Sequence, residues 1–262
     1  MATLVTFHAH PDDESIGVGG VMRKAADEGH RVVLVVATRG ENGEVPDGFL
    51  ADGEQLWQRR VVETQAAADI LGVQRVEFLG YTDSGMMGTP TNDTPGSFWT
   101  ASVDEAAAKL AAILREENAD VLTVYDDNGG YGHPDHIQVH RVGIKAAELA
   151  GTPRVYQNTM NRDQILRGRV FMDATTDDMP DIEGRDNFGK PEEVITAAVD
   201  VTKYLDTKRA AMRAHASQIS DSSFFLAMPM EAFSYGFGTE WFIRDGQGPG
   251  ITETDLMAGL PT

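Results

Sequence analysis

Two short segments of this chain concentrate the side chains that bind metal ions or move protons. The first is HPDDE at residues 10–14, in which four ionisable groups stand within five residues. Buried together, such groups would destabilise one another unless a cation or open solvent compensated their charges. A bound metal ion would do so. The alternative is a solvated acidic turn at the start of a helix, where the helix dipole favours carboxylates. This segment alone leaves both interpretations open.

The second segment is DDNGGYGHPDH at residues 126–136, which adds His133, Asp135 and His136. Like the first segment, it directly follows an expected strand and enters an expected helix. In open α/β sheets the strand order often reverses between the first and fourth strands, so the loops that leave their carboxyl ends border the same crevice. We therefore expect the two segments to face each other and to form one site.

Histidine nitrogens and carboxylate oxygens bind zinc, and a catalytic zinc site keeps three protein ligands and an open fourth position. His10, Asp13 and His136 satisfy that count. The spacing of His10 and Asp13 lets a turn aim both groups inward, which leaves Asp12 free for proton transfer. His140 lies four residues after His136, a spacing known from other zinc sites. It is therefore either a second candidate ligand or a structural histidine.

The elements that position these segments follow from an alternation of β-branched runs with longer amphipathic stretches, which predicts a parallel sheet. We expect a Rossmann-like α/β fold with a mostly parallel sheet and helices on both faces. The expected strands cover residues 3–7, 31–37, 75–79, 120–125 and 154–156, and the expected helices cover residues 15–28, 54–71, 103–117 and 134–149. Long loops at 38–53 and 80–100 follow strand ends, where functional residues accumulate.

The pattern weakens after residue 158. A polar stretch at 173–190 precedes an expected strand at 194–201 and an expected helix near 203–214. We expect residues 1–160 to form a Rossmann-like catalytic core and residues 161–262 to form a smaller C-terminal lobe. The lobe would complete the substrate pocket, and the two parts together would make one compact unit.

The composition narrows the chemistry and the partners. The 262 residues include 41 acidic and 22 basic side chains, and the formal net charge of −19 would repel nucleic acid and anionic membrane surfaces. There is no cysteine, so imidazole and carboxylate groups alone must hold any metal. No apolar run approaches the ~20 residues of a membrane span, and no signal segment opens the sequence. We expect a cytoplasmic protein that acts on a small molecule; the sequence does not indicate its oligomeric state.

Two motifs, AHPDDE at residues 9–14 and GGYGHPDH at residues 129–136, together resemble the PIG-L or LmbE-like deacetylases. The resemblance extends over roughly residues 3–150. It is supported by residues 40–45, 60–63 and 83–86, and more weakly by AHASQ at residues 214–218. Within the family the chain is most similar to the actinobacterial mycothiol branch, which includes N-acetylglucosaminyl-inositol deacetylases and mycothiol conjugate amidases.

The resemblance implies a hydrolase that removes an acetyl group from an N-acetylglucosamine-type substrate by means of metal-activated water. Asp12 would be the general base, and His133, helped by Tyr131, would stabilise the oxyanion, where one donor contributes on the order of 3 kcal/mol. The zinc ligands would be His10, Asp13 and His136. Ferrous iron is a possible alternative to zinc, because the same ligand types suit both ions.

The resemblance also implies that Arg60 and Asp83 hold the hydroxyl groups of the sugar or the inositol, and Glu41 is counted with them as a substrate-binding residue. A separate hypothesis concerns Asp135, which is close to His133 in the sequence. A neighbouring carboxylate raises the pKa of a histidine. Asp135 would therefore keep the His133 imidazole protonated and oriented.

Three alternatives stay open at this point. The same site could belong to an amidase that acts on a larger mycothiol-type conjugate. A non-catalytic sugar-binding protein would also share the fold, although it would have no reason to keep both Asp12 and His133. A metal phosphoesterase needs two metals about 4 Å apart and more ligands. The spare carboxylates for a second metal would be Glu14, Asp126, Asp127 and Asp135.

Overall fold

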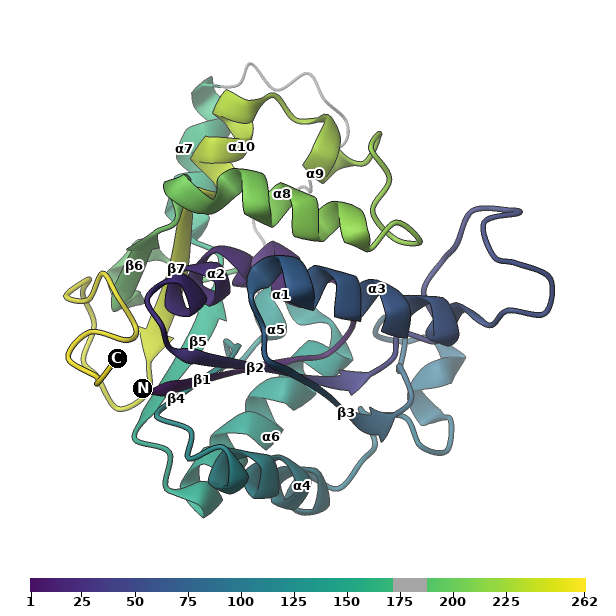
Figure 1. The fold of residues 1–262 in the computed structure, drawn as a ribbon, viewed down its shortest axis with the longest axis horizontal. Helices are drawn as coiled ribbons and strands as arrows, with labels where there is room; N and C mark the ends of the chain where they lie inside the picture. The colour runs from purple at the N-terminus through teal and green to yellow at the C-terminus, as the bar shows by residue number, and fades with distance from the viewer. Residues whose placement is uncertain (172–187) are drawn as a thin grey trace.

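The computed structural model describes residues 1–171 and 188–262, and it is built around one seven-stranded sheet (Figure 1). The strand order is β3-β2-β1-β4-β5-β7-β6. The first five strands of the chain pair in parallel, whereas β7 runs antiparallel to both β5 and β6. The strands are β1 (Thr3–His8), β2 (Arg31–Thr38), β3 (Arg75–Tyr81), β4 (Val121–Tyr125), β5 (Arg154–Thr159), β6 (Ala197–Asp200) and β7 (Thr239–Arg244).

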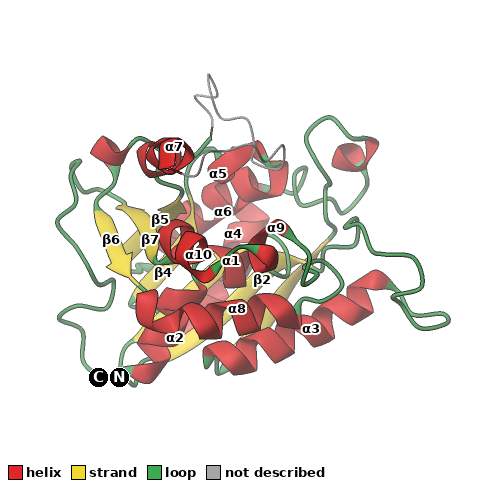
Figure 2. Cartoon of the chain, turned by 90° about the horizontal axis from the view of Figure 1, so that it is seen from above, coloured by secondary structure: helices red, strands yellow, loops and turns green. Residues whose placement is uncertain are grey.

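Helices cover both faces of the sheet, as expected from the sequence. Successive side chains of a strand point to opposite faces, so Leu4 of β1 packs into one core and Val5 packs into the other. The core that contains Val5 lies under α4 (Val103–Glu116) and α6 (Pro134–Ala150). The opposite face carries α1 (Asp13–Gly17), α2 (Gly19–Asp27), α3 (Leu56–Leu71) and α8 (Leu205–Ala214). Figure 2 shows α2, α8 and α3 side by side over that face.

The reversal of strand order falls between β1 and β4, which are neighbours in the sheet. From β1 the chain proceeds outward through β2 to β3, and from β4 it proceeds in the other direction to β5. The carboxyl ends of these parallel strands therefore share one edge of the sheet. The predicted meeting of residues 10–14 with residues 126–136 is confirmed, because both segments leave the sheet at that edge.

The second half of the chain completes this sheet. β6 and β7 pair beyond β5, so the sheet crosses the expected boundary at residue 160. β7 was not predicted because its alternation of buried and exposed residues is not visible in the sequence. Glu240 and Phe242 are the buried positions, and a glutamate normally indicates an exposed position. Lys208 neutralises Glu240 with an ion pair of 2.5 Å.

The other helices are α5 (Gly129–Gly132), α7 (Arg162–Phe171), α9 (Phe224–Ala227) and α10 (Met230–Phe237). The short 3-10 helices are η1 (Pro90–Asp93), η2 (Glu192–Val194) and η3 (Thr202–Tyr204).

The helix expected at residues 15–28 is in fact two helices, α1 and α2, separated at Val18. The Glu240 carboxylate accepts hydrogen bonds of 2.8 Å from the backbone N–H groups of Gly20 and Val21, so it caps the start of α2. This cap comes from a strand more than two hundred residues away, and no local pattern could reveal it. The polar stretch predicted at 173–190 lies mostly outside the described residues. Within the described part of the chain, no helix has the length and apolar character needed to cross a lipid bilayer.

Candidate active site

Two histidines and one aspartate meet where the loop after β1 faces the start of α6. Asp13 Oδ2 lies 3.3 Å from His10 Nδ1 and 3.4 Å from His136 Nε2. Ligand atoms about 2.1 Å from a tetrahedral zinc ion lie about 3.4 Å apart. His136 Nε2 is buried and has no hydrogen-bond partner among the described residues. Asp13 Oδ2 is therefore spaced from each of the two histidine nitrogens as two ligands of one metal ion would be.

The charges at this point also favour a cation. Burial opposes ionisation of Asp13, yet the nearby His136 and His10 hold its pKa well below the ordinary value. Burial likewise works against a charged His10, but the carboxylates of Asp13, Asp135 and Asp83 raise its pKa well above the ordinary value. An imidazole surrounded by three carboxylates attracts positive charge, which a proton or a metal ion can supply.

The Asp135 carboxylate faces His10 and not His133. Its Oδ2 lies 3.1 Å from His10 Nε2 and accepts a 2.9 Å hydrogen bond from the backbone N–H of Ser84, while its Oδ1 accepts from the Ser84 hydroxyl. With Nδ1 of His10 directed at Asp13, this contact leaves Nε2–H as the donor to Asp135. Carboxylates commonly orient metal-binding histidines in this way. Asp135 is wholly buried, so its partners are fixed.

The hypothesis that Asp135 keeps His133 protonated stays a prediction: the charge of Asp135 raises the pKa of His133, but burial and the charges of His10 and His136 outweigh it. The backbone N–H of Asp135 donates a 3.1 Å hydrogen bond to His133 Nδ1, because His133 caps the N-terminus of α6. A protonated Nδ1 could not accept that bond. Burial lowers the pKa of His133 to about 3, and the nearby His10 and His136 add to the effect. Its Nε2–H remains as a donor, and the ring centroid lies 4.6 Å from that of His10 and 5.0 Å from that of His136.

Asp12 stands at the same loop in an unusual backbone conformation, with φ of 99°. Its Oδ2 accepts a 3.2 Å hydrogen bond from Arg60 Nη2. Burial raises the pKa of Asp12 to about 6, although the positive charge of Arg60 opposes the shift. A carboxylate with a pKa near neutrality can both take up and release a proton at physiological pH.

Arg60 belongs to α3 and was expected to contact substrate. In the structure its guanidinium is buried and faces the protein: besides Asp12 it donates to the carbonyl oxygens of Pro11 and Gly40. A Cβ on Gly40 would lie 2.1 Å from Arg60 Nη1, so this glycine makes room for the guanidinium. The described contacts therefore link Arg60 to the shape of the loop that carries Asp12.

Asp83 and Glu41 come from the loops after β3 and β2. Asp83 Oδ1 lies 3.5 Å from His10 Nε2 and accepts a 2.8 Å hydrogen bond from the backbone of Gly85. Burial opposes its ionisation, but His10 holds the pKa of Asp83 below its ordinary value. Glu41 accepts from the Asp83 backbone N–H at 3.1 Å and pairs with Arg39 at 3.0 Å. The Asp83 carboxylate thus borders His10, and Glu41 contacts the backbone of Asp83.

Tyr131 lies at the open side of the site. Its ring centroid is 5.0 Å from that of His136 and 6.2 Å from that of His133, and 44% of the residue is exposed. Partial burial of the residue raises the pKa of its hydroxyl above the ordinary value. The hydroxyl therefore stays protonated and can donate a hydrogen bond.

Comparison with known proteins shows the family of this chain. Residues 5–147, which contain both motifs, match the model of the PIG-L family, described as GlcNAc-PI de-N-acetylase. The chain belongs to this family. It is 42% identical, over 98% of its own length and 95% of the relative's, to a protein named 1D-myo-inositol 2-acetamido-2-deoxy-alpha-D-glucopyranoside deacetylase from Acidothermus cellulolyticus. The predicted membership in a hydrolase family of deacetylases is thus confirmed.

Solved structures confirm the fold. A diacetylchitobiose deacetylase from Pyrococcus horikoshii superposes with a TM-score of 0.61 at 21% identity, covering 92% of this chain and 83% of that one. A 4-carboxy-2-hydroxymuconate hydratase from Pseudomonas putida superposes with a TM-score of 0.60 at 18% identity, covering 97% and 99%. The same fold therefore carries different reactions, and the reaction of this PIG-L family member must be argued from its site.

Some histidines and carboxylates of this PIG-L family member serve the scaffold. His140 Nδ1 contacts the backbone oxygen of Tyr125 at 3.0 Å, as a structural histidine would, and the described clusters that could hold a metal ion do not include His140. Asp126 is wholly buried and accepts from Thr159 Oγ1 and from the backbone of the 126–130 loop. Asp127 pairs with Lys190. These carboxylates, proposed as spare ligands of a second metal, are thus occupied elsewhere.

Two residues that support the histidines were missed from the sequence. The Tyr125 ring stacks on His136 at 4.4 Å with an interplanar angle of 14°, and its hydroxyl lies 2.9 Å from His8 Nδ1. Ser84 binds both oxygens of Asp135. Tyr125 ends β4 directly before the second motif, and Ser84 adjoins Asp83, but neither residue type indicates a site by itself. Their roles appear only when the strand ends are brought together.

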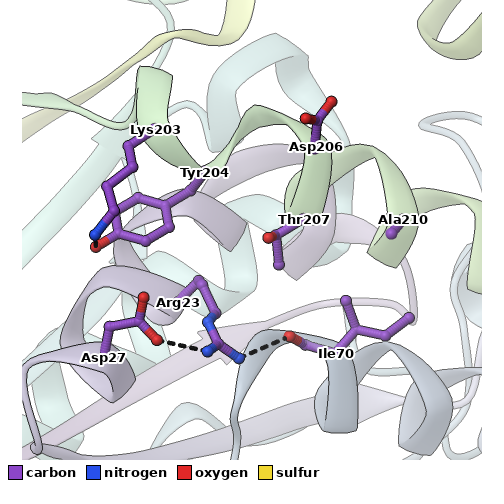
Figure 3. A pocket seen from close by; sticks show the side chains of 8 residues that line it. All are labelled: Arg23, Asp27, Ile70, Lys203, Tyr204, Asp206, Thr207 and Ala210. Carbon is purple, nitrogen blue, oxygen red and sulfur yellow. Dashed lines mark hydrogen bonds and ion pairs between the residues drawn. The ribbon is translucent and has the colours of Figure 1, made fainter.

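A separate pocket of about 540 Å³ lies between α2, α3 and η3–α8, and none of its lining residues belongs to the site above (Figure 3). Arg23 spans its floor, donating to Asp27 and to the backbone oxygen of Ile70. The guanidinium is therefore paired with the protein itself, and the two motifs at the strand ends lie outside this pocket.

Proposed function

We propose that this chain hydrolyses the acetamide of an N-acetylglucosamine unit joined to inositol, using a divalent metal ion held by His10, Asp13 and His136. One observation carries the proposal: a single oxygen of Asp13 lies within 3.4 Å of a nitrogen of each histidine, and the His136 nitrogen is otherwise unpartnered. The substrate class rests on the name of the 42% identical relative, which matches nearly the whole chain.

When bound, the metal ion supplies Lewis acidity and lowers the pKa of water at the site. Asp12 accepts the proton that the attacking water loses as its oxygen bonds to the acetamide carbon. Asp12 then delivers this proton to the nitrogen as the C–N bond breaks, so the products are the free amine and acetic acid, which loses its remaining proton to become acetate. The pKa of about 6 suits a group that must do both.

The neutral His133 donates from Nε2–H to the carbonyl oxygen as negative charge develops on it. Loss of one such donor costs about 10²- to 10³-fold in kcat. A neutral imidazole that already carries this proton needs no protonation step before catalysis. The Tyr131 hydroxyl, held near His133 at the open side of the site, is the second donor to the same oxygen or to the incoming substrate.

Asp83 and Glu41 are proposed to accept hydrogen bonds from hydroxyl groups of the substrate, because the Asp83 carboxylate borders His10 and Glu41 contacts the Asp83 backbone from the neighbouring loop. Arg60 is assigned instead to holding Asp12, since its donors point to Asp12, Pro11 and Gly40. The metal is proposed to be zinc. Two imidazoles and a carboxylate also suit ferrous iron, so the metal has to be measured.

The test combines metal analysis with a free-amine assay. The protein is stripped with a chelator, reloaded with zinc or ferrous iron, and given N-acetylglucosaminyl-inositol or N-acetylglucosamine alone. We expect no amine release from the stripped protein, recovery after reloading, and a preference for the inositol-bearing substrate. Absence of turnover on any acetamide by the loaded protein would contradict the proposal.

Two substitutions separate the roles of ligand and base. Asp12→Ala is expected to bind metal and lose activity, whereas His136→Ala is expected to lose the metal. His140→Ala is the matched control, because it removes an imidazole from the same helix without removing a proposed ligand. Equal metal loss in Asp12→Ala and His136→Ala would mean that the roles are misassigned.

A further inference from the structure

Glu14 and His215 form a buried pair that the proposed reaction does not use. His215 Nε2 lies 2.6 Å from Glu14 Oε1, and both side chains are wholly buried. The Ser15 hydroxyl donates to the same oxygen at 2.6 Å. His215 directly follows α8, in the AHASQ segment, and is 201 residues from Glu14 in the sequence. Tertiary folding has therefore brought a histidine of the C-terminal half to the first motif.

The other oxygen of Glu14 holds the backbone of Asp12. Glu14 Oε2 accepts a 3.0 Å hydrogen bond from the Asp12 N–H. In the described part of the chain, Asp12 is one of only two non-glycine residues with positive φ. Such a conformation is unfavourable for a residue with a side chain and persists only where the surroundings enforce it. The Glu14 carboxylate is one of the groups that enforce it.

The AHASQ segment is itself fixed to the helix that carries Arg60. The backbone N–H and the hydroxyl of Ser217 donate to Glu63 at 2.9 and 2.6 Å, and Glu63 lies one turn after Arg60 on α3. α3 and α8 pack against each other over the same face of the sheet. One helix pair thus supports Asp12 at two points, with Arg60 on the carboxylate and His215, through Glu14, on the backbone.

We propose that Glu14 and His215 are positioning residues, which hold the Asp12 backbone in its positive-φ conformation and so aim the Asp12 carboxylate at the reacting water. This inference rests on the proposed role of Asp12 as the base. It assigns a function to the C-terminal segment: the AHASQ turn fixes the geometry of a base that is contributed by the N-terminal motif. A displacement of about 1 Å in a reacting group can cost 10²-fold in rate.

The test compares three variants of the full-length, metal-loaded protein. His215→Phe fills the space of the ring but removes the donor to Glu14, and His215→Gln keeps an N–H donor. His30→Phe is the matched control: His30 is also buried and also has an unpartnered Nδ1 among the described atoms, but it precedes β2 at the opposite edge of the sheet from the site. The readouts are kcat, KM, metal content, thermal unfolding and amide hydrogen exchange of a peptide that spans residues 9–17.

We expect His215→Phe to lower kcat by about 10- to 100-fold with KM and metal content close to wild type, and to speed exchange in the 9–17 peptide. His215→Gln should recover most of the lost kcat and most of the protection. His30→Phe should leave both unchanged even if it lowers the unfolding temperature. Equal effects of His215→Phe and His30→Phe, or no recovery with glutamine, would overturn the inference.

Hydrogen exchange separates this inference from the proposed function. If the loaded wild-type protein releases no amine from any acetamide, the proposed function fails. In that case, unchanged exchange of the 9–17 peptide in His215→Phe would also overturn the inference that Glu14 and His215 hold the Asp12 backbone. Faster exchange restricted to this peptide would support that structural role.

Discussion

Replacing Asp135 by asparagine should weaken metal binding through His10. The substitution keeps the size of the side chain but removes the charge that faces His10 Nε2 at 3.1 Å, and it brings an amide N–H₂ group toward either His10 or the two donors of Ser84. A hydrogen bond to a charged group contributes about 1.5 to 3 kcal/mol. That range corresponds to roughly 10- to 100-fold in affinity, the usual effect of removing the partner of a metal-binding histidine.

The metal dissociation constant is measured by competition with a chromophoric chelator at fixed pH. Asp126→Asn is the control, because Asp126 is an equally buried aspartate whose partners are Thr159 and backbone N–H groups. We expect the control to change the constant by less than about twofold. The reasoning would be refuted if Asp135→Asn left the metal affinity unchanged and altered only the pH dependence of kcat, since Asp135 would then act on His133.

Two further predictions concern the scaffold. Arg31, with Arg75, holds the pKa of Glu117 at about 2, below its ordinary value of 4.5. The ion pair therefore stabilises the folded state fully above about pH 4.5, and this stabilisation is lost as the pH falls toward 2. Glu117→Gln should lower the free energy of unfolding by about 1 to 3 kcal/mol at pH 7. Urea titrations should show that this difference from wild type becomes smaller in acid. A difference independent of pH would contradict a stabilising ion pair of Glu117 with Arg31 and Arg75. Gly143→Ala should destabilise by about 1 to 3 kcal/mol despite its better helix propensity, because the new Cβ would lie 2.3 Å from Val124 Cγ1; a variant as stable as wild type in urea would show that α6 can move away from β4.

Much of the site could be predicted because its residues are consecutive in the sequence. A strand followed by HPDDE and a strand followed by GGYGHPDH each put ionisable groups at a strand end. Because the strand order often reverses in open α/β sheets, the two strand ends were predicted to lie side by side. The pairing of β1 with β4 confirms this. The zinc ligands and Asp12 as the base remain predictions, since they concern chemistry that only metal binding and kinetics can test.

The partners of individual side chains could not be predicted in the same way. Asp135 is two residues from His133 in sequence, and that proximity suggested the wrong contact: α6 directs its backbone N–H to His133 and its carboxylate to His10 and Ser84. Arg60 was expected at the substrate but is buried against the loop of Asp12. In both cases the direction of the side chain, and not its position in the sequence, decides what it does.

The α/β class, the strand ends with ionisable side chains and the available ligand types could be predicted from the amino-acid sequence, because they follow from local patterns of side chains. Tertiary structure alone decided the antiparallel β7, the cap of α2 by Glu240, and the contact of His215 with Glu14. The residues in these contacts are about eighty positions apart for β5 and β7 and about two hundred positions apart for the other two. Their polar groups are buried, and buried polar groups need hydrogen-bond partners. Local patterns carry no information about such partners, so only the folded chain shows that His215 of its C-terminal half contacts Glu14 of the first motif.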